Sequence, residues 1–358
     1  MSAAFLLTRI VLSFNDRSED LRGELSAAAL SPDGSLWVGS DEFLTLERLS
    51  PIEPGIYGNH QAFSLADFVD LCNRDDEIDI EGMDCANHYL WLTGSHSTKR
   101  KKPKGKKPEK DIKRLSETKT DVNRYILARI PIVGDTPFKS CSHPHDPDLQ
   151  LSAACLQTEG ESNILIAALA EDPHLAPFIA SGLPSKDNGL DIEGLAVCGD
   201  RLFLGLRGPV LRGWAIILEI EIAETEPGIL TLKELGKDGR HYRKYFVDLH
   251  GLGVRELCWY GEDLLILAGP TMALAGYTRL FRLKNALDLD EDSLFSQDND
   301  RLELLFDLPF TPDRDNAEGL ALFPCLGHEN ALLVVYDSPD ANRKLGESAV
   351  FADVFRLP

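Results

Sequence analysis

The sequence of 358 residues lacks the patterns of a disulfide-stapled, zinc-ribbon or membrane-spanning protein. Its seven cysteines are scattered, odd in number and free of any CxxC pair, which favours small core residues in a reducing compartment. No apolar run approaches the roughly 20 residues that a membrane-spanning helix needs. The N-terminal apolar stretch has neither the charged start nor the small-residue cleavage site of a secretion signal. We therefore expect a cytoplasmic protein that does not bind membranes.

Positive charge is also scarce. The chain has 37 Lys and Arg against 58 Asp and Glu, a formal net charge of -21. A field of this sign repels phosphate, which argues against nucleic acid as a partner. The sequence has no G-x-S-x-G elbow and no Cys/His pairing, so it does not suggest a covalent nucleophile. Its hydrophobic content of 43% is nevertheless high enough for a large folded core.

What the sequence does contain is a glutamate repeated ahead of a short apolar strand. The motif reads DIEG at 79–82 and again at 191–194, and NAEG at 316–319. Copies recur about every sixty residues, with one interval of double length. Each copy is followed by an apolar strand, a turn rich in Gly, Asp or Asn, and a second strand. The repeated glutamates are Glu24, Glu81, Glu193, Glu256 and Glu318.

Repeats of this length, with four strands each, predict an all-β fold, a β-propeller, in a single domain over 1–358. The last repeat has only three strands, and one extra strand at 5–14 precedes the first glutamate. We expect this N-terminal strand to join the C-terminal strand near 350–356 and close the propeller. The spacing favours five blades. Six blades are the alternative, because the segment from Gln150 loosely resembles the one from Glu24.

Two insertions account for the double interval if there are five blades. Residues 98–122 form a Lys-rich tract with little to bury, which predicts a disordered basic loop between the second and third strands of the blade of Glu81. Residues 160–183 have helix-like apolar spacing, and Ser162 is in position to cap a helix. We expect a short helical insertion there.

The repeated glutamates would form a ring at one mouth of the propeller channel. Carboxylates this close together repel each other, so they need protons, basic partners, backbone N–H groups or a cation. One hypothesis is that each accepts hydrogen bonds from backbone amides of the neighbouring blade. The other is a metal site, for which hard oxygen ligands favour Ca²⁺ or Mg²⁺. The predicted metal ligands are Glu24, Glu81, Glu193, Glu256 and Glu318.

Residues that follow the second strands are expected at the same mouth. Among them, Arg207 and Arg212 lie in a glycine-framed loop and would hold a phosphate or carboxylate against a bound cation. The alternative is that Arg207, together with Arg255, only neutralises the glutamate ring. The predicted ligand-binding residues are Arg207, Arg212, Asp41, His96 and Asp337.

The segments SKDNGLDIEGLAV, LGLRGPVLRGW, VREL and NAEGLAL together resemble a bacterial family known as a domain of unknown function. More distantly, the chain is similar to the propellers described as the esterase-like domain of phytase, which also carry D-x-E-G repeats. The resemblance spans most of the chain and implies a propeller, but no mechanism. Here the D-x-E-G pattern is complete only at Glu81 and Glu193; Leu follows Glu24 and Glu256, and Asn316 replaces the acid before the last glutamate.

Two functions follow from these features. The first is a divalent-cation-dependent hydrolase of a small anionic ester, lactone or phosphoester at the channel mouth. The second is a non-catalytic propeller that binds a protein partner with the same face, aided by the Lys-rich tract. The two hypotheses differ in whether the chain is an enzyme.

Overall fold

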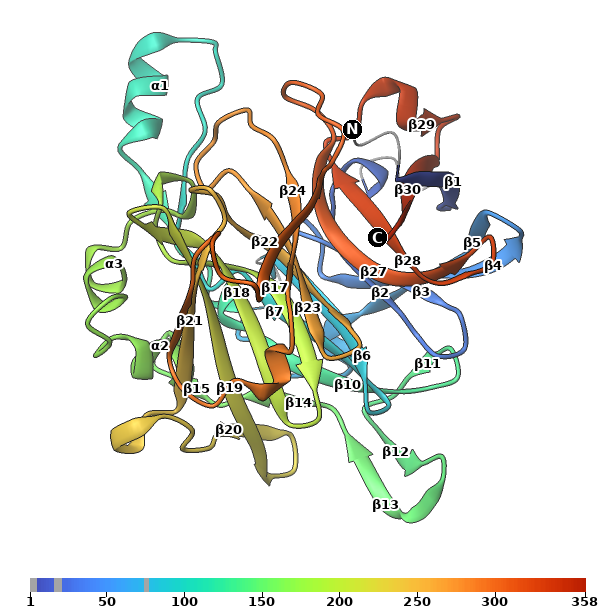
Figure 1. The fold of residues 1–358 in the computed structure, drawn as a ribbon, viewed down its shortest axis with the longest axis horizontal. Helices are drawn as coiled ribbons and strands as arrows, with labels where there is room; N and C mark the ends of the chain where they lie inside the picture. Colours follow the sequence, from blue (N-terminus) through green and yellow to red (C-terminus); the bar gives the residue numbers. More distant parts are fainter. Residues whose placement is uncertain (1–4, 16–20, 74–76) are drawn as a thin grey trace.

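The computed structural model describes residues 5–15, 21–73 and 77–358, and most regular structure in these residues is β (Figure 1). The principal strands form five groups in which neighbouring strands pair antiparallel. The first strand of each group, here called the inner strand, contains or directly follows a repeated motif. The inner strands are β2 (Leu25–Leu30), β6 (Ile80–Ala86), β17 (Asp191–Cys198), β22 (Gly253–Tyr260) and β27 (Asn316–Cys325).

Three further strands complete each group, in the order of their pairing. The second strands are β3 (Leu36–Ser40), β7 (Tyr89–Gly94), β18 (Arg201–Leu211), β23 (Asp263–Gly269) and β28 (His328–Asp337). The third strands are β4 (Thr45–Glu53), β10 (Leu127–Val133), β19 (Trp214–Glu226), β24 (Arg279–Leu283) and β30 (Ala349–Arg356). The fourth strands are β5 (Ile56–Ser64), β14 (Ala154–Leu156), β21 (Tyr242–Asp248), β26 (Leu302–Asp307) and β1 (Leu6–Ser13).

The fourth strand of the last group comes from the other end of the chain. β1 pairs antiparallel with β30, from Leu6 opposite Phe355 to Ser13 opposite Ala349. This is the pairing that the three-stranded last repeat predicts. β1 also pairs in parallel with β5, and β14 pairs in parallel with β20 (Ile229–Leu232), so hydrogen bonding continues from one group to another.

The inner strands contact one another in the cyclic order β2, β6, β17, β22, β27 and back to β2. Glycine makes this approach feasible. A Cβ atom on Gly82 would lie 2.8 Å from the backbone oxygen of Glu193, and one on Gly194 would lie 2.9 Å from the side chain of Leu257. The glycine of the E-G pair therefore marks the place where one inner strand packs directly on the next.

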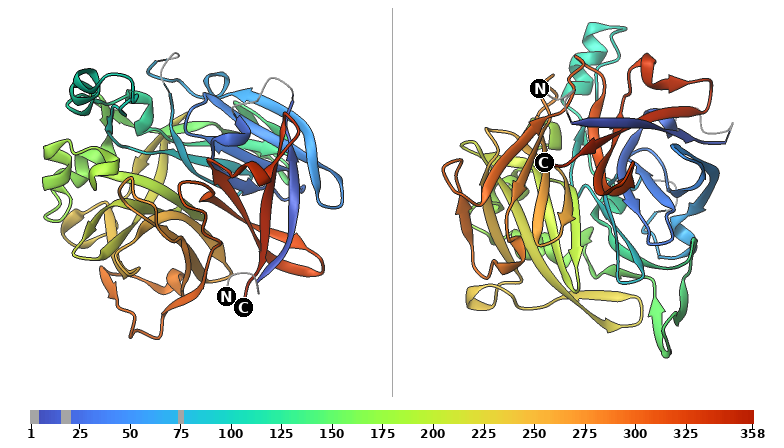
Figure 2. Two further views of the ribbon diagram at one scale, coloured as in Figure 1. Left: turned by 90° about the horizontal axis from the view of Figure 1, so that it is seen from above. Right: turned by 45° about the vertical axis from the view of Figure 1, so that its right-hand side comes forward.

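The hydrophobic core is divided among the spaces between groups. Trp37 of the first group packs in one cluster with Leu90 of the second, and Leu265 of the fourth packs with Leu332 of the fifth. Each group is therefore apolar on both faces and needs a neighbour on each side. Figure 2 shows the sheets arranged about a common centre, with the helices at the periphery.

The basic insertion lies between β7 and β10, but the structure describes a ribbon and a helix where the sequence suggests a disordered loop. β8 (Lys99–Arg100) pairs with β9 (Thr118–Lys119), and the segment between them forms α1 (Pro108–Leu115). Proline in the first turn, acidic residues near the start and basic residues near the end all suit a helix and its dipole. None of the residues of α1 is buried, so local preferences rather than packing define it.

The second insertion holds α2 (Ile164–Leu169) and α3 (Ala176–Ser181). Asn163 rather than Ser162 caps α2, because its side-chain oxygen accepts the backbone N–H of Leu165 at 3.0 Å. Leu165 also packs into the core between the second and third groups. No helix in the described parts of the chain is long and apolar enough to cross a membrane.

Candidate functional site

Each inner strand has a register shift against its second strand at the repeated motif. In β17, for example, Ile192 and Gly194 lie opposite consecutive residues of β18, so Glu193 is bulged. A bulge re-aims a side chain away from the regular alternation of the strand. The residues at these shifts are Ser26, Glu81, Glu193, Arg255 and Glu318.

The bulges change the alignment of the repeats. Arg255, and not Glu256, takes in β22 the position that Glu193 takes in β17. Likewise Glu24 lies two residues before the bulged Ser26, which is the position of the Asp in the D-x-E-G motif. A shift of one residue along a strand turns a side chain to the opposite face. The bulged positions therefore carry three glutamates, one arginine and one serine, in place of the five glutamates expected from the sequence.

Acidic side chains from four groups converge at this end of the inner strands. The carboxyl group of Glu81 interacts with the charges of Asp41, Glu193 and Glu318, which belong to three other groups. Three arginines, Arg124, Arg207 and Arg255, reach the same region. We call the acidic residues of this region the carboxylate cluster; it consists of Glu24, Asp41, Glu42, Asp79, Glu81, Asp191, Glu193, Glu318 and Asp337.

Glu193 is held by two arginines. Nη1 of Arg207 lies 2.6 Å from its Oε1, and Nε of Arg255 lies 3.1 Å from its Oε2. Arg255 continues to an ion pair with Glu318 on the next inner strand. Arg207 also donates from Nε to the carbonyl oxygen of Thr271 at 3.0 Å. Both oxygens of Glu193 are thus engaged by the side chains of arginines.

The third arginine, Arg124, forms an ion pair with Asp79. Arg124 lies in a short 3₁₀ helix, Val122–Tyr125, after the basic insertion, and its Nε donates to the carbonyl oxygen of Ser97 at 3.0 Å. The sequence patterns predicted neither residue as part of the site. Asp79 had a signal, because the motif repeats an acid two residues before the glutamate, whereas Arg124 follows a long polar insertion and belongs to no repeat.

Glu256 points between strands instead of into the cluster. Its Oε1 accepts the backbone N–H groups of Leu195, at 2.9 Å, and of Leu257, at 2.8 Å. Burial raises the pKa of Glu256 well above its usual range, which favours the protonated form of the group. Glu256 thus has the contacts of the first hypothesis, in which a glutamate accepts hydrogen bonds from backbone amides of the neighbouring group. It links β22 to β17 without any ligand.

Asp41 combines burial with an unsatisfied oxygen. Its Oδ1 is buried and makes no hydrogen bond to the described residues. Burial raises the pKa of Asp41 to about 8, and the charges of Asp79, Asp337, Glu42 and Glu24 add to this effect. Asp41, Glu24 and Glu42 each offer a carboxylate oxygen within 4.8 Å of the others. Either a proton or a bound cation would reduce the repulsion between these carboxylates.

Among the described residues, the arginines that reach the cluster are too few to pair every one of its acids. Burial raises the pKa of Asp191 to about 7, although Arg207 lies 3.7 Å away and opposes the shift. Burial and the neighbouring carboxylates also raise the pKa of Glu81 well above its usual range. Within the described residues Glu81 forms no ion pair. The cluster therefore retains protons at neutral pH or attracts cations.

The residues after the second strands divide between the cluster and other places. Three of these residues occupy equivalent positions, namely Asp41, Arg207 and Asp337. Each directly follows the second-strand residue that pairs with the inner strand immediately before its bulge. Ser95 takes that position in β7's group and hydrogen-bonds Asp79, so its neighbour His96 points elsewhere.

His96 is buried, and both of its ring nitrogens are used. Nδ1 lies 2.8 Å from the carbonyl oxygen of Gly94, and Nε2 lies 2.8 Å from the side-chain amide of Asn163. Burial lowers the pKa of His96 to about 4, so it is neutral. Arg212 is exposed in the two-residue turn between β18 and β19. Neither residue joins the cluster.

The chain belongs to the family described as protein of unknown function (DUF3616), whose model matches residues 24–353. The match begins at the first repeated glutamate and includes every inner strand. It agrees with the resemblance drawn from the motifs of the sequence. A comparison with curated proteins finds no match.

Solved structures of low sequence identity align with nearly the whole chain. The PQQ-bound aldose sugar dehydrogenase from Streptomyces coelicolor is 12% identical, with 98% of this chain and 99% of that chain covered and a TM-score of 0.40. Virginiamycin B lyase from Staphylococcus aureus is 8% identical, with 98% and 99% covered and a TM-score of 0.37. A luciferin-regenerating enzyme is 10% identical, with 98% and 95% covered and a TM-score of 0.38. At these TM-scores the likeness carries no inference about activity.

Proposed function

We propose that the chain is a closed five-bladed β-propeller whose carboxylate cluster binds Ca²⁺ or Mg²⁺ and uses it to hydrolyse a small anionic ester, lactone or phosphoester. The blade count is supported by the cyclic contacts of the inner strands and by the hydrophobic clusters between consecutive groups. The pairing of β1 with β30 supports closure.

The observation that carries the cation proposal is the buried Oδ1 of Asp41, which has no hydrogen-bond partner among the described residues. Its carboxylate lies with those of Glu24 and Glu42, and hard oxygen ligands of this kind suit Ca²⁺ and Mg²⁺. Glu42 is exposed, so an ion would reach the group from solvent. Binding would displace the proton that Asp41 otherwise keeps up to about pH 8.

The proposed chemistry follows from the neighbours of this group. A bound cation with open positions polarises an ester or phosphoryl oxygen and activates a water molecule. Glu81, whose raised pKa favours its protonated form, would donate a proton to the leaving group. Asp337 lies near Asp41, and Arg207, which pairs with Glu193 in the same cluster, adds a positive charge that would favour an anionic ligand. His96 and Arg212 lie outside this arrangement.

Calorimetry with Ca²⁺ and with Mg²⁺ tests the cation site. We expect the wild type to bind at least one of them, and its thermal midpoint to rise with the logarithm of the cation concentration. Asp41→Asn should lose both effects. The matched control is Asp146→Asn, on the exposed hairpin of β12 (Ser140–His143) and β13 (Asp146–Ser152), which should bind like the wild type. If Asp41→Asn binds the cation as tightly as the wild type and shows the same rise in thermal midpoint, the proposed site is wrong.

Hydrolysis is tested separately with a panel of p-nitrophenyl esters, lactones and phosphoesters. Turnover that stops with chelator and returns with the cation would support the hydrolase. Cation binding without turnover of any of these classes would leave a non-catalytic propeller that binds its partner at the same end. If the wild type does turn over one of these substrates, Glu81→Gln should reduce its turnover because the proposed role of Glu81 is proton donation. The cation affinity of this variant should stay within about threefold of the wild type.

A further inference from the structure

Basic residues are concentrated in the insertion that carries α1. Residues 99–119 hold eleven of the 37 Lys and Arg residues and only three of the 58 Asp and Glu residues. The rest of the chain is therefore even more acidic than the net charge of -21 suggests. A basic segment on a strongly acidic body is a local positive potential in a field of the opposite sign.

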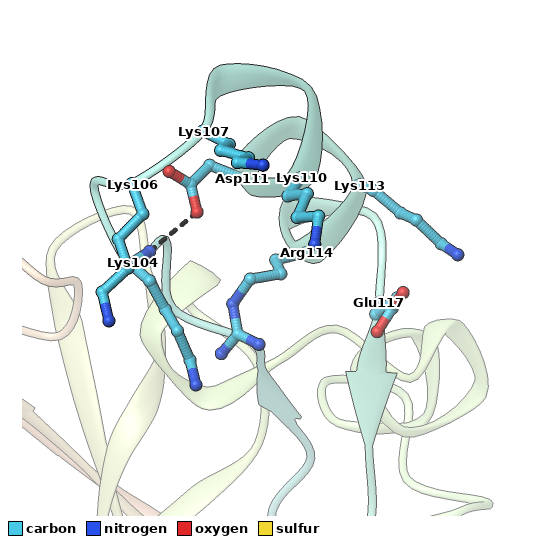
Figure 3. A pocket seen from close by; sticks show the side chains of 8 residues that line it. All are labelled: Lys104, Lys106, Lys107, Lys110, Asp111, Lys113, Arg114 and Glu117. Atoms are coloured by element: carbon cyan, nitrogen blue, oxygen red, sulfur yellow. Dashed lines mark hydrogen bonds between the residues drawn. The ribbon is translucent and has the colours of Figure 1, made fainter.

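These side chains surround a cavity of about 490 Å³. Figure 3 shows Lys104 and Lys106 on one side of this space and Lys110 and Arg114 reaching down from α1, while Lys113 points away. The volume is within the range of small-molecule sites, about 300 to 1,000 Å³. The lining residues are Lys104, Lys106, Lys107, Lys110, Asp111, Lys113, Arg114 and Glu117.

The acidic residues of the lining are already engaged. Asp111 accepts the backbone N–H of Lys104 at 2.8 Å, and Glu117 pairs with the amino group of Lys101 at 2.5 Å. Arg114 donates from Nε to a backbone carbonyl oxygen at 2.6 Å, which fixes its guanidinium group. Within the described residues, the amino groups of the lining lysines form no ion pair. Their charges are therefore available to a ligand.

The insertion is also fixed to the body of the protein. Arg100 pairs with Asp187 at 2.6 Å, and Lys99 pairs with Glu77. The backbone N–H of Ser185 donates to the carbonyl oxygen of Thr98 at 2.9 Å. A cavity on an anchored ribbon loses less conformational entropy on binding than one on a free loop.

From these features we infer that the cavity beside α1 is a second binding site, for a compact anion with two or more phosphate groups. Lysine ammonium groups and an arginine fork around one volume match several phosphates at once. A long polyanion such as nucleic acid, or an anionic membrane, would also have to approach the acidic body, which repels it. This inference does not depend on the proposed function.

Titration calorimetry with inorganic tripolyphosphate as the probe tests the site. The wild type should bind it, more weakly as salt rises, and orthophosphate should bind far less. In the triple variant Lys106→Ala, Lys110→Ala and Arg114→Ala we expect the affinity to fall by about tenfold or more. The charge-matched control changes three exposed residues elsewhere, Lys237→Ala, Lys344→Ala and Arg314→Ala, and should stay within about twofold of the wild type.

Further ligands in the same experiment identify the source of the phosphates. If adenosine triphosphate binds as tightly as tripolyphosphate, the phosphates alone are recognised; if it binds tighter, the cavity also contacts the nucleoside. Either result supports the site. Absence of binding, or equal binding by the triple variant and its control, would overturn it. The site would also be overturned if the triple variant lost binding only to single-stranded oligonucleotides or to phosphatidylserine vesicles. That result would indicate a macromolecular partner. The triple variant should retain its thermal midpoint, since α1 buries no residue.

Discussion

The carboxyl group of Glu256 on β22 accepts the backbone N–H of Leu195 on β17 at 2.9 Å, across the boundary between two inner strands. The same oxygen accepts the N–H of Leu257, so one buried acid satisfies two amides. Its neighbour Arg255 takes the bulged position and joins Glu193 to Glu318. Two consecutive residues of β22 thus have different roles: Glu256 hydrogen-bonds the backbone, and Arg255 pairs with two carboxylates of the cluster.

Glu256→Ala should destabilise the protein without affecting cation binding. The change leaves the N–H groups of Leu195 and Leu257 buried without an acceptor, which costs about 2 to 4 kcal/mol of unfolding free energy. Urea denaturation measures this loss. Calorimetry on the folded variant should show the same cation affinity as the wild type. A cation affinity weaker than that of the wild type would contradict the conclusion that Glu256 takes no part in cation binding.

Arg255→Gln should also destabilise the fold, for a different reason. Glu193 and Glu318 would lose a shared partner while both remain largely buried. Removing one member of a buried ion pair costs about 3 to 5 kcal/mol. Because the remaining carboxylates then repel, the loss should be larger at pH 9 than at pH 5, as denaturant titrations at the two pH values would show. A loss that does not change with pH would argue against the ion-pair origin.

Gly194→Ala tests the close approach of the inner strands. Its Cβ would meet the side chain of Leu257 at 2.9 Å and the backbone nitrogen of the same residue at 3.0 Å. Overpacking of this kind costs about 1 to 3 kcal/mol. The control is Gly23→Ala, whose Cβ would meet nothing closer than Lys344 Nζ at 3.7 Å. If thermal denaturation shows equal losses in the two variants, the packing argument fails.

Stability in chelator should fall as the pH rises toward 8. The folded protein keeps a proton on Asp41 up to about pH 8, whereas the unfolded chain releases it near 3.8. A raised folded-state pKa stabilises the protein below the unfolded value, and that stabilisation is lost as the pH rises through the folded value. Asp191, with a pKa of about 7, acts in the same direction.

The slope of unfolding free energy against pH between about 5 and 8 should be smaller in Asp41→Asn than in wild type or Asp146→Asn. Cation affinity should show the opposite trend. It should rise by up to about tenfold per pH unit below pH 8 and then level off, because one proton leaves for each ion bound. An affinity that is constant over this interval would indicate that the cation binds away from Asp41.

Replacing 101–117 with a short Gly-Ser linker should leave the thermal midpoint nearly unchanged. The backbone N–H of Lys101 lies 3.1 Å from the carbonyl oxygen of Glu117, so a short linker can join the ends. No residue of α1 is buried, and the anchors at Lys99 and Arg100 are retained. Differential scanning calorimetry should show a shift of at most about 2 °C. A drop of many degrees would show that the insertion packs on the body.

The sequence by itself determined the repeat, the all-β architecture and the origin of the last group's fourth strand. Alternating apolar residues fix strands locally, and a three-stranded last repeat with an extra N-terminal strand leaves an edge that β1 covers. The position of the basic insertion followed from the double interval between two of the repeated glutamates. Its helix did not, because Pro108 and the charges at its two ends outweigh the polar composition that suggested disorder.

Only the tertiary structure decided which side chains meet at the carboxylate cluster. Aligning the repeats on their glutamates places Glu256 with Glu193, but the bulge in β22 puts Arg255 there. A bulge is a one-residue change of register that depends on the facing strand, so the inner strand's own sequence does not reveal it. Arg124 reaches Asp79 from outside any repeat, and such a contact exists only once the groups have packed around their common centre.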